Sequence, residues 1–216
     1  MKKILTATLA GCGSLLLLST ASAAPLVGGA TVVDVTVNLG SVGIVAAPLG
    51  DASVVDADDL IVQFPITGGD LDMDSLGGMI EHVGSGLSLT ANDVTVNLTD
   101  FTIDTVNQQL TGNVAVDGGA DLGRVAIFDF DLSGLMAGDI TNTDDPSISL
   151  LLTGAAADAL ADALVIPALS DLAETEFGLA ATAPEFGGGD AIPLPGAAIF
   201  FVTGAAAFAA RRRLGA

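Results

Sequence analysis

The sequence contains no tryptophan and no tyrosine, and it has one histidine, His82, and one cysteine, Cys12. A zinc site built on several histidines is therefore excluded, and a Ser-His-Asp triad would have to use His82. The Gly-x-Ser-x-Gly elbow of the α/β-hydrolases is absent. The missing Trp and Tyr also remove the usual platforms on which sugar rings stack. These absences predict a protein that is not an enzyme.

Positive charge is equally scarce, with six Lys and Arg against 26 Asp and Glu. All of the acidic residues lie between Asp34 and Asp190, and Arg124 is the one fixed cation in that part of the chain. Residues 24–191 therefore carry a formal charge of −25. A field of this sign repels nucleic acids and anionic membrane surfaces, so nucleic-acid binding is excluded.

The first residues have the pattern of an export signal. Lys2 and Lys3 precede the apolar run from Ile4 to Leu18, and Ala21-Ser22-Ala23 is a small-x-small cleavage pattern before Ala24. We predict a signal peptide over residues 1–23, helical until it is removed, with the Sec translocon and signal peptidase as partners. A cut at Ala23 would also remove Cys12 and leave no thiol.

Cys12 leaves an alternative open. Leu9-Ala10-Gly11-Cys12 matches a bacterial lipobox, which would make a lipidated Cys12 the mature N-terminus. That cut would leave a very short signal, so we favour cleavage after Ala23.

The last residues combine three features in a fixed order. Ile192-Pro193-Leu194-Pro195-Gly196 follows a Gly-rich linker at residues 185–191, an uncharged run follows it, and Arg211-Arg212-Arg213 comes after. The fifteen uncharged residues between Pro195 and Arg211 would span about 22 Å as a helix, against about 30 Å for a bilayer core. We therefore expect a transmembrane helix with only transient residence in the inner membrane, its arginines on the cytoplasmic side.

This arrangement over residues 192–216 resembles the PEP-CTERM sorting signals, and specifically their VPLPA variant. Ile192 stands in place of Val, and Gly196 in place of Ala. The resemblance implies recognition by an exosortase, which would cut near the Pro motif and pass the protein to the cell surface or extracellular matrix. The alternative is an ordinary single-span anchor.

The middle of the chain, residues 24–184, has the alternation of β-strands with one wet face. Apolar residues alternate with polar ones over 33–39, 60–66, 87–103, 110–116, 126–132 and 148–152. An Ala-rich helix is expected from Ala155 to Leu164, before Pro167, and a last strand from Phe177 to Ala181. The fold class predicted is all-β, an antiparallel sandwich or barrel of about 8–10 strands.

Two stretches of this region have further interest. Asp34-Val-Thr-Val-Asn-Leu39 recurs letter for letter at Asp93–Leu98, through duplication of β-halves or by coincidence. The runs Phe64–Asp72 and Ile80–Leu87 resemble bacterial surface β-domains of the haem-binding HtaA type. Without tyrosine, a Tyr haem ligand does not carry over to this chain.

The best candidate for a metal site lies in the same stretch. Asp70, Asp72, Asp74 and Glu81 have positions 1, 3, 5 and 12 of a calcium loop. Ser75 stands where an EF-hand requires Gly, so the expectation is a looser Ca²⁺ site or a solvated acidic turn. Asp129 and Asp131, on one face of a strand, form a second candidate pair.

Together these features predict an exported cell-surface or extracellular-matrix protein with a non-enzymatic structural or interaction role and no cofactor. Extracellular polysaccharide is a candidate partner. The alternative is a Ca²⁺-dependent adhesion or carbohydrate-binding module.

Overall fold

The computed structural model describes residues 23–187. The described residues form eleven β-strands: β1 (Ala24–Asp34), β2 (Val45–Gly50), β3 (Ser53–Asp56), β4 (Ile61–Pro65), β5 (Gly68–Leu71), β6 (Gly78–Ala91), β7 (Val94–Asp104), β8 (Gln109–Val116), β9 (Asp121–Asp129), β10 (Ile148–Leu152) and β11 (Glu176–Phe186). The helices are η1 (Leu39–Val42), α1 (Ala137–Ile140), α2 (Gly154–Leu164) and η2 (Pro167–Leu172). The prediction of a mainly antiparallel β-fold is confirmed, with more strands than expected.

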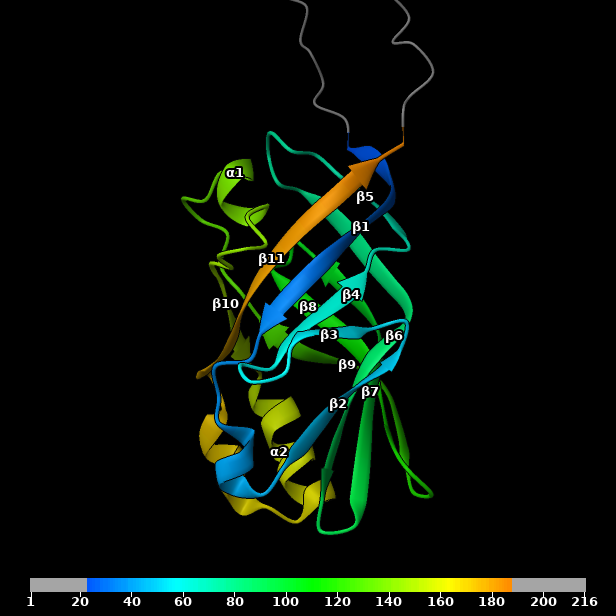
Figure 1. Cartoon of the computed structure of the whole chain (residues 1–216), viewed down its shortest axis with the longest axis vertical. Helices are drawn as coiled ribbons and strands as arrows, with labels where there is room; N and C mark the ends of the chain where they lie inside the picture. Colours follow the sequence, from blue (N-terminus) through cyan, green and yellow to red (C-terminus); the bar gives the residue numbers. More distant parts are fainter. Residues whose placement is uncertain (1–22, 188–216) are drawn as a thin grey trace, which may run out of the picture.

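The strands form one antiparallel sheet that closes on itself. Its order is β11-β10-β9-β8-β7-β6-β5-β1-β4-β3, and β1 pairs in addition with β11. That closing ladder runs from Leu26 opposite Phe186 to Asp34 opposite Leu179. The first and last strands of the domain thus hold each other, and Figure 1 shows them side by side.

Two strands have a free edge. β2 pairs only with β6, and β3 pairs only with β4. β2 carries Pro48, opposite Leu87 of β6, and Pro has no N–H to give to a further strand. β3 is short, fully exposed and interrupted by a bulge before Asp56. Both edges are thus poor templates for another strand.

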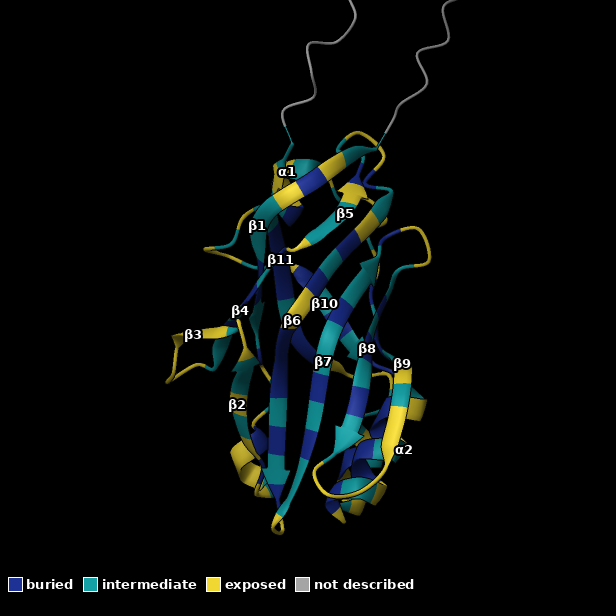
Figure 2. Ribbon diagram, turned by 90° about the vertical axis from the view of Figure 1, so that its right-hand side faces the viewer, coloured by how far each residue is buried: buried dark blue, intermediate teal, exposed yellow. Residues whose placement is uncertain are grey.

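The alternation seen in the sequence gives the sheet its apolar interior. Val62 and Phe64 of β4, Leu87 and Leu89 of β6, and Val96 of β7 are all buried in one cluster. This pattern is visible as alternating burial along β6 and β7 in Figure 2.

Gly112 of β8 packs closely against two side chains of this interior, Phe101 and Ile127. A Cβ at this position would lie 2.8 Å from Phe101 Cδ1 and 2.9 Å from Ile127 Cδ1. The position therefore has no room for a side chain.

The helix predicted from its Ala and Leu spacing is present as α2, and Figure 1 shows it at one end of the closed sheet. Thr153 caps its N-terminus by accepting a hydrogen bond from the Ala156 N–H at 3.2 Å. Leu160 and Leu164 lie on its buried face. Pro167 begins η2, so the chain cannot continue as one helix.

Several boundaries differ from the predictions. The strand expected over residues 126–132 is observed as β9, which begins earlier and ends at Asp129. The strand expected over residues 33–39 is wrong beyond Asp34, where the pairing of β1 with β4 and β11 ends. β4 begins opposite this residue, whereas β11 continues to Glu176 in its pairing with β10. The last strand is longer than expected and continues to Phe186. Residues 185 and 186 thus belong to the sheet, not to the predicted linker.

The two ends of the described domain leave from one pole. The Gly187 N–H donates a hydrogen bond to the Pro25 carbonyl at 3.0 Å. Figure 1 places this pole at the opposite end of the molecule from α2. Among residues 23–187, no helix has the length and apolar character needed to cross a bilayer.

Candidate functional site

The predicted sorting and cleavage residues lie outside the described residues. This holds for Ile192, Pro193, Leu194, Pro195 and Gly196, for Arg211, Arg212 and Arg213, and for Ala21 at the signal cleavage site. The peptide bond predicted to be cut by signal peptidase joins Ala23 to Ala24. Ala24 is the first residue of β1, and Ala23 directly precedes it.

The candidate calcium ligands are not gathered. Asp70 lies in β5 opposite Met79, and Glu81 lies in β6 opposite Gly68. Asp72 accepts the N–H groups of Asp74 at 2.8 Å and of Ser75 at 3.2 Å, so it closes its own turn. Within residues 23–187, no group of three or more His, Cys, Asp or Glu side chains could hold a metal ion. The calcium-loop spacing here reflects a strand followed by a turn.

The second acidic pair is also divided. Asp129 accepts a hydrogen bond from Gln109 Nε2 at 3.1 Å, whereas Asp131 accepts from the Ser133 N–H and hydroxyl at 2.7 and 2.8 Å. The two hydrogen bonds from Ser133 lower the pKa of the Asp131 carboxyl. Each carboxylate therefore has a local structural partner.

His82 is the most enclosed ionisable side chain of the described domain, with 1% of its surface exposed. Its Nδ1 lies 2.9 Å from the Pro65 carbonyl, and its Nε2 lies 3.2 Å from Thr31 Oγ1. A carbonyl can only accept, so Nδ1 carries a proton. Burial lowers the pKa of His82, while the hydrogen bonds to the backbone of Pro65 and Phe64 act to raise it.

The polar chain from His82 crosses the seam where the sheet closes. Thr31 Oγ1 of β1 also lies within hydrogen-bond distance of Thr182 Oγ1 of β11, at 3.0 Å. His82, Thr31 and Thr182 thus link β6, β1 and β11 inside an apolar core. The ring of Phe64 meets the imidazole edge-on, with centroids 6.4 Å apart. This arrangement is that of a packed, hydrogen-bonded histidine.

Sequence reasoning missed Thr31 and Thr182. Both are buried, at 3% and 5% exposure, among strand residues that are otherwise apolar or small. A hydroxyl on the inward face of a strand is the signal that could have found them, because buried hydroxyls require partners.

Arg124 lies on the outer surface of the sheet. Its Nε donates to Thr111 Oγ1 at 3.1 Å, and its Nη2 donates to Thr102 Oγ1. Asp121, the acidic residue nearest to Arg124 in the sequence, accepts the Gly123 N–H at 2.9 Å. The guanidinium therefore joins strands β7, β8 and β9.

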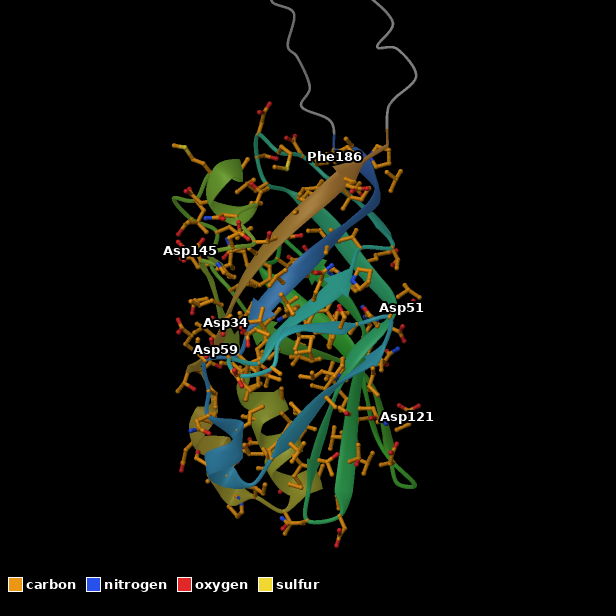
Figure 3. The ribbon with its side chains drawn as sticks, in the orientation of Figure 1. Asp34, Asp51, Asp59, Asp121, Asp145 and Phe186 are labelled. Carbon is orange, nitrogen blue, oxygen red and sulfur yellow. The ribbon has the colours of Figure 1, made fainter. Side chains whose placement is uncertain are left out.

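A polar groove of about 620 Å³ lies between the end of β1, β2 and the β3–β4 turn. Its carboxylates are Asp34, Asp58 and Asp59, and Figure 3 shows Asp34 and Asp59 on this side of the molecule. The N–H groups of Asp58 and Asp59 are both given to Asp56 Oδ1. The groove is thus an acidic surface beside a local turn.

Three small apolar cavities lie within and beside the closed sheet. One of them, of about 50 Å³, lies beside His82 and Phe64. A second, of about 40 Å³, lies toward Leu71 and Ile140, and a third, of about 60 Å³, lies between the sheet and α2. Close-packed interiors contain few voids larger than a water molecule, so these cavities are a distinctive feature of the domain.

Comparisons with known proteins give little further information. No protein-family model and no curated protein matches the chain. A solved structure, the C-terminal domain of HtaA from Corynebacterium glutamicum, aligns over 74% of this chain and 99% of its own length, with 17% identity and a TM-score of 0.45. At this identity and TM-score we assign no family, ligand or activity from the likeness.

Proposed function

We propose that this chain is an exported protein of the cell surface or extracellular matrix, with a non-enzymatic structural or interaction role. Its C-terminal segment, residues 192–216, would be a sorting signal processed by an exosortase. The sequence of Pro motif, uncharged run and Arg triplet is the observation that carries the proposal.

The geometry of the domain supports separate roles for the ends and the body of the chain. The ladder between β1 and β11 closes the sheet without residues beyond 23–187. Both ends leave at one pole, so a signal peptide and a sorting tail could be removed without breaking a strand pair.

The non-enzymatic role is supported by how the reactive side chains are used. Both nitrogens of His82 have partners within the core, and Ser85 donates its hydroxyl to the His82 carbonyl at 3.2 Å. Under this proposal, Sec translocon and signal peptidase act first, exosortase acts at the inner membrane, and polysaccharide outside the cell is the candidate partner.

Mass spectrometry of the protein recovered from the cell surface tests this proposal. We expect a chain that begins at Ala24 and lacks Arg211, Arg212 and Arg213. Replacing Pro193 and Pro195 by Ala should leave the tail uncut and the protein in the membrane fraction. A matched control replaces the three arginines by lysine, which keeps the charge, and should be processed normally. Surface material that retains the full tail would refute exosortase processing.

A further inference from the structure

A groove of about 280 Å³ lies at the pole from which both ends of the described domain leave. Asp72 of this groove is half-buried, and Asp74 is exposed. Figure 3 shows Phe186 at the same pole. The lining residues are Ala24, Leu71, Asp72, Met73, Asp74 and Phe186. The groove therefore brings two carboxylates beside the first residue of β1.

The backbone nitrogen of Ala24 points toward the groove. Ala24 pairs with Leu71 of β5. The carbonyl of Pro25 accepts the Gly187 N–H, on the side of β1 that faces β11. Since neighbouring residues of a strand direct their backbone groups to opposite sides, the nitrogen of Ala24 faces β5. The two strands are antiparallel, so this nitrogen lies beside the carbonyl end of Leu71, from which the chain continues to Asp72.

Asp72 has an oxygen to offer to a further donor. Its Oδ1 accepts the N–H groups of Asp74 at 2.8 Å and of Ser75 at 3.2 Å, which leaves Oδ2 for another partner. The turn thus holds the carboxylate in place beside the groove. Arg124 is the one Lys or Arg between residues 24 and 187, and it donates to threonines of β7 and β8. A new cation at the pole would therefore meet a carboxylate that has no charged partner.

We propose that the cut after Ala23 creates this cation and that the groove binds it. Hydrolysis adds one water to the Ala23–Ala24 bond: the new carboxyl stays with the signal peptide, and Ala24 keeps an α-amine that is protonated at pH 7. The α-ammonium pairs with the Asp72 carboxylate, with Asp74 close by, whereas the uncut chain has a neutral amide at this place. Capture of an N-terminal amine is a recurring mode of recognition. The pairing rests on the signal cleavage that the proposed function includes.

The pairing would strengthen the pole where the sorting tail departs. Pro25, next to Ala24, accepts the Gly187 N–H at 3.0 Å. Gly187 is the last described residue before the predicted sorting segment. An ammonium that fixes Ala24 against the β5 turn therefore also supports this contact between the two ends. Signal cleavage thus makes the mature domain more stable than the same domain with a neutral nitrogen at Ala24.

Chemical modification of the amine tests the proposal in the mature protein recovered from the cell surface. Lys2 and Lys3 belong to the predicted signal peptide, and the sequence has no other lysine. The α-amine is therefore the single primary amine of a chain that begins at Ala24. Acetylation removes its charge and should lower Tm at pH 7 by about 1–3 °C, whereas reductive dimethylation keeps the charge and should leave Tm nearly unchanged. Equal Tm values for the acetylated and unmodified proteins would overturn the proposal.

Two variants locate the effect. Asp72→Asn keeps an oxygen for the N–H groups of the turn but loses the charge, so acetylation should then lower Tm by less than half as much as in the wild type. Asp121→Asn is the matched control, because Asp121 also accepts an N–H two residues on, from Gly123, and Figure 3 shows it toward the α2 end. This control should respond to acetylation as the wild type does. The same response in both variants would overturn the pairing with Asp72.

NMR of the ¹³C-dimethylated protein gives a readout that does not depend on stability. The methyl resonance follows protonation of the amine, and a nearby carboxylate favours the ammonium form. The midpoint of this titration should therefore be lower in Asp72→Asn than in the wild type by at least about 0.3 pH, and unchanged in Asp121→Asn. Should Asp72→Asn fail to fold, nuclear Overhauser contacts from the labelled methyl groups to Met73, which lines the groove, test the wild type directly. Absence of these contacts would overturn the proposal.

The N-terminal residue of the recovered protein separates this proposal from the proposed function. A chain that begins elsewhere than at Ala24 would overturn the predicted signal cleavage and, with it, the ammonium in the groove. A chain that begins at Ala24 but shows no difference between acetylated and unmodified protein would overturn the pairing alone and leave the proposed export intact.

Discussion

The two copies of Asp-Val-Thr-Val-Asn-Leu have the same six residues and different structures. The copy at 93–98 begins in a turn and continues as strand β7. The copy at 34–39 has only Asp34 in β1, and Leu39 already begins η1. Local sequence is identical, so the difference must come from what lies on either side.

The later copy has a neighbour on each side and a turn before it. Val96 pairs with Leu89 of β6 and with Val116 of β8. The turn at Asn92 and Asp93 has positive φ at both residues, 51° and 61°, as a two-residue hairpin turn of type I′ requires. This turn places Val94 opposite Ala91 and fixes the register of the whole strand.

The earlier copy begins where the pairing of β1 with β4 and β11 ends. Asp34 is the last residue of β1 to pair with β4 and with β11. Beyond it, Val35 and Val37 donate single hydrogen bonds to Leu60 and Phe177. Asn38 then accepts the Ser41 N–H at 3.0 Å, which caps η1. The availability of partner strands thus decides whether the sequence remains a strand.

We expect the largest effects on stability from the last residue of each copy, Leu39 or Leu98. Substituting these leucines tests whether the two copies contribute equally to the core although their structures differ. Leu39 and Leu98 occupy the same place in the hexapeptide and are 4% and 5% exposed. Leu39→Ala and Leu98→Ala should each lower the free energy of unfolding by about 2–5 kcal/mol, measured by chemical denaturation. A small effect of Leu39→Ala alone would show that η1 is not part of the core.

The second valine of each copy, Val37 or Val96, should contribute differently to the free energy of unfolding. Val96 is fully buried at 0% exposure, whereas Val37 is half-buried. Val96→Ala should cost about 1–3 kcal/mol, and Val37→Ala less than about 1 kcal/mol, because only the former leaves a cavity in a closed interior. Equal costs in the same denaturation experiment would contradict the difference in packing.

Sequence patterns predicted the strands whose two faces differ in environment. β4, β7 and β8 were found by their alternation, and α2 by its Ala and Leu spacing before Pro167. β2 and β3 were missed because they are edge strands, largely exposed, and do not alternate. The end of β1 at Asp34 was missed because alternation does not say where partner strands end.

The candidate sites were harder to predict than the fold. Calcium-loop spacing placed four acids close in sequence, but among residues 23–187 these acids do not form a group that could hold a metal ion, because they are divided between β5, β6 and the turn between them. The contact of Thr31 with Thr182 joins residues 151 positions apart, which no local pattern reveals. The cavities depend on small differences in side-chain volume and have no signature in the sequence.

Protonation of His82, which lies beside the later copy, should lower the stability of the protein as the pH falls below neutral. His82 of β6 lies opposite Phe101, in the continuation of that copy along β7. Burial lowers its pKa below the usual 6.5, so the unfolded chain binds a proton more readily than the folded one. Its contribution to stability is therefore complete above pH 6.5 and is lost as the pH falls from there through the lowered pKa, by at most about 1.4 kcal/mol per pH unit.

Denaturation at pH 7.5 and 5.5 checks this expectation, because ordinary carboxylates remain largely ionised over that range. His82→Gln should be less stable at pH 7.5 and show a flatter pH dependence. Val37→Ala, in the earlier copy, should retain the dependence of the wild type. A wild-type protein equally stable at both pH values would contradict the effect of burial on His82.

Asn38 and Asn97 occupy the same place in the two copies. Here we expect the substitution in the earlier copy to lower the free energy of unfolding more, the reverse of the expectation for Val37 and Val96. Asn38→Ala removes the cap of η1 and should cost about 0.5–1 kcal/mol, near the low end for capping residues. Asn97 Nδ2 donates to Asp117 Oδ1 at 2.6 Å on the exposed surface, so Asn97→Ala should cost less than about 0.5 kcal/mol. Denaturation curves that show Asn97→Ala to be the costlier change would refute this ordering.

The smallest expected effect concerns Asp100, which lies two residues after the later copy, where β7 continues past an irregularity. Asp100 has a φ of 53° at the irregularity in β7, and its Oδ1 accepts the Gly84 N–H at 2.8 Å. That hydrogen bond lowers the pKa of Asp100, helped by Asn113, so the stabilisation is present above the usual 3.8 and is lost as the pH falls below it. Because Asp100 is only half-buried, whereas His82 is 1% exposed, the loss should be smaller than that caused by His82.

Asp100→Asn separates the shape of this turn from its charge. Asn tolerates a positive φ and keeps an oxygen for the Gly84 N–H, so the variant should fold with nearly unchanged Tm at pH 7. Between pH 4.5 and 2.5 it should lose less stability than the wild type, because it has no carboxylate to protonate. Asp121→Asn, whose oxygen accepts the Gly123 N–H at the start of β9, is the control and should follow the wild-type pH dependence. If Asp100→Asn unfolds at pH 7, charge rather than backbone shape holds the irregularity that carries the later copy past residue 98.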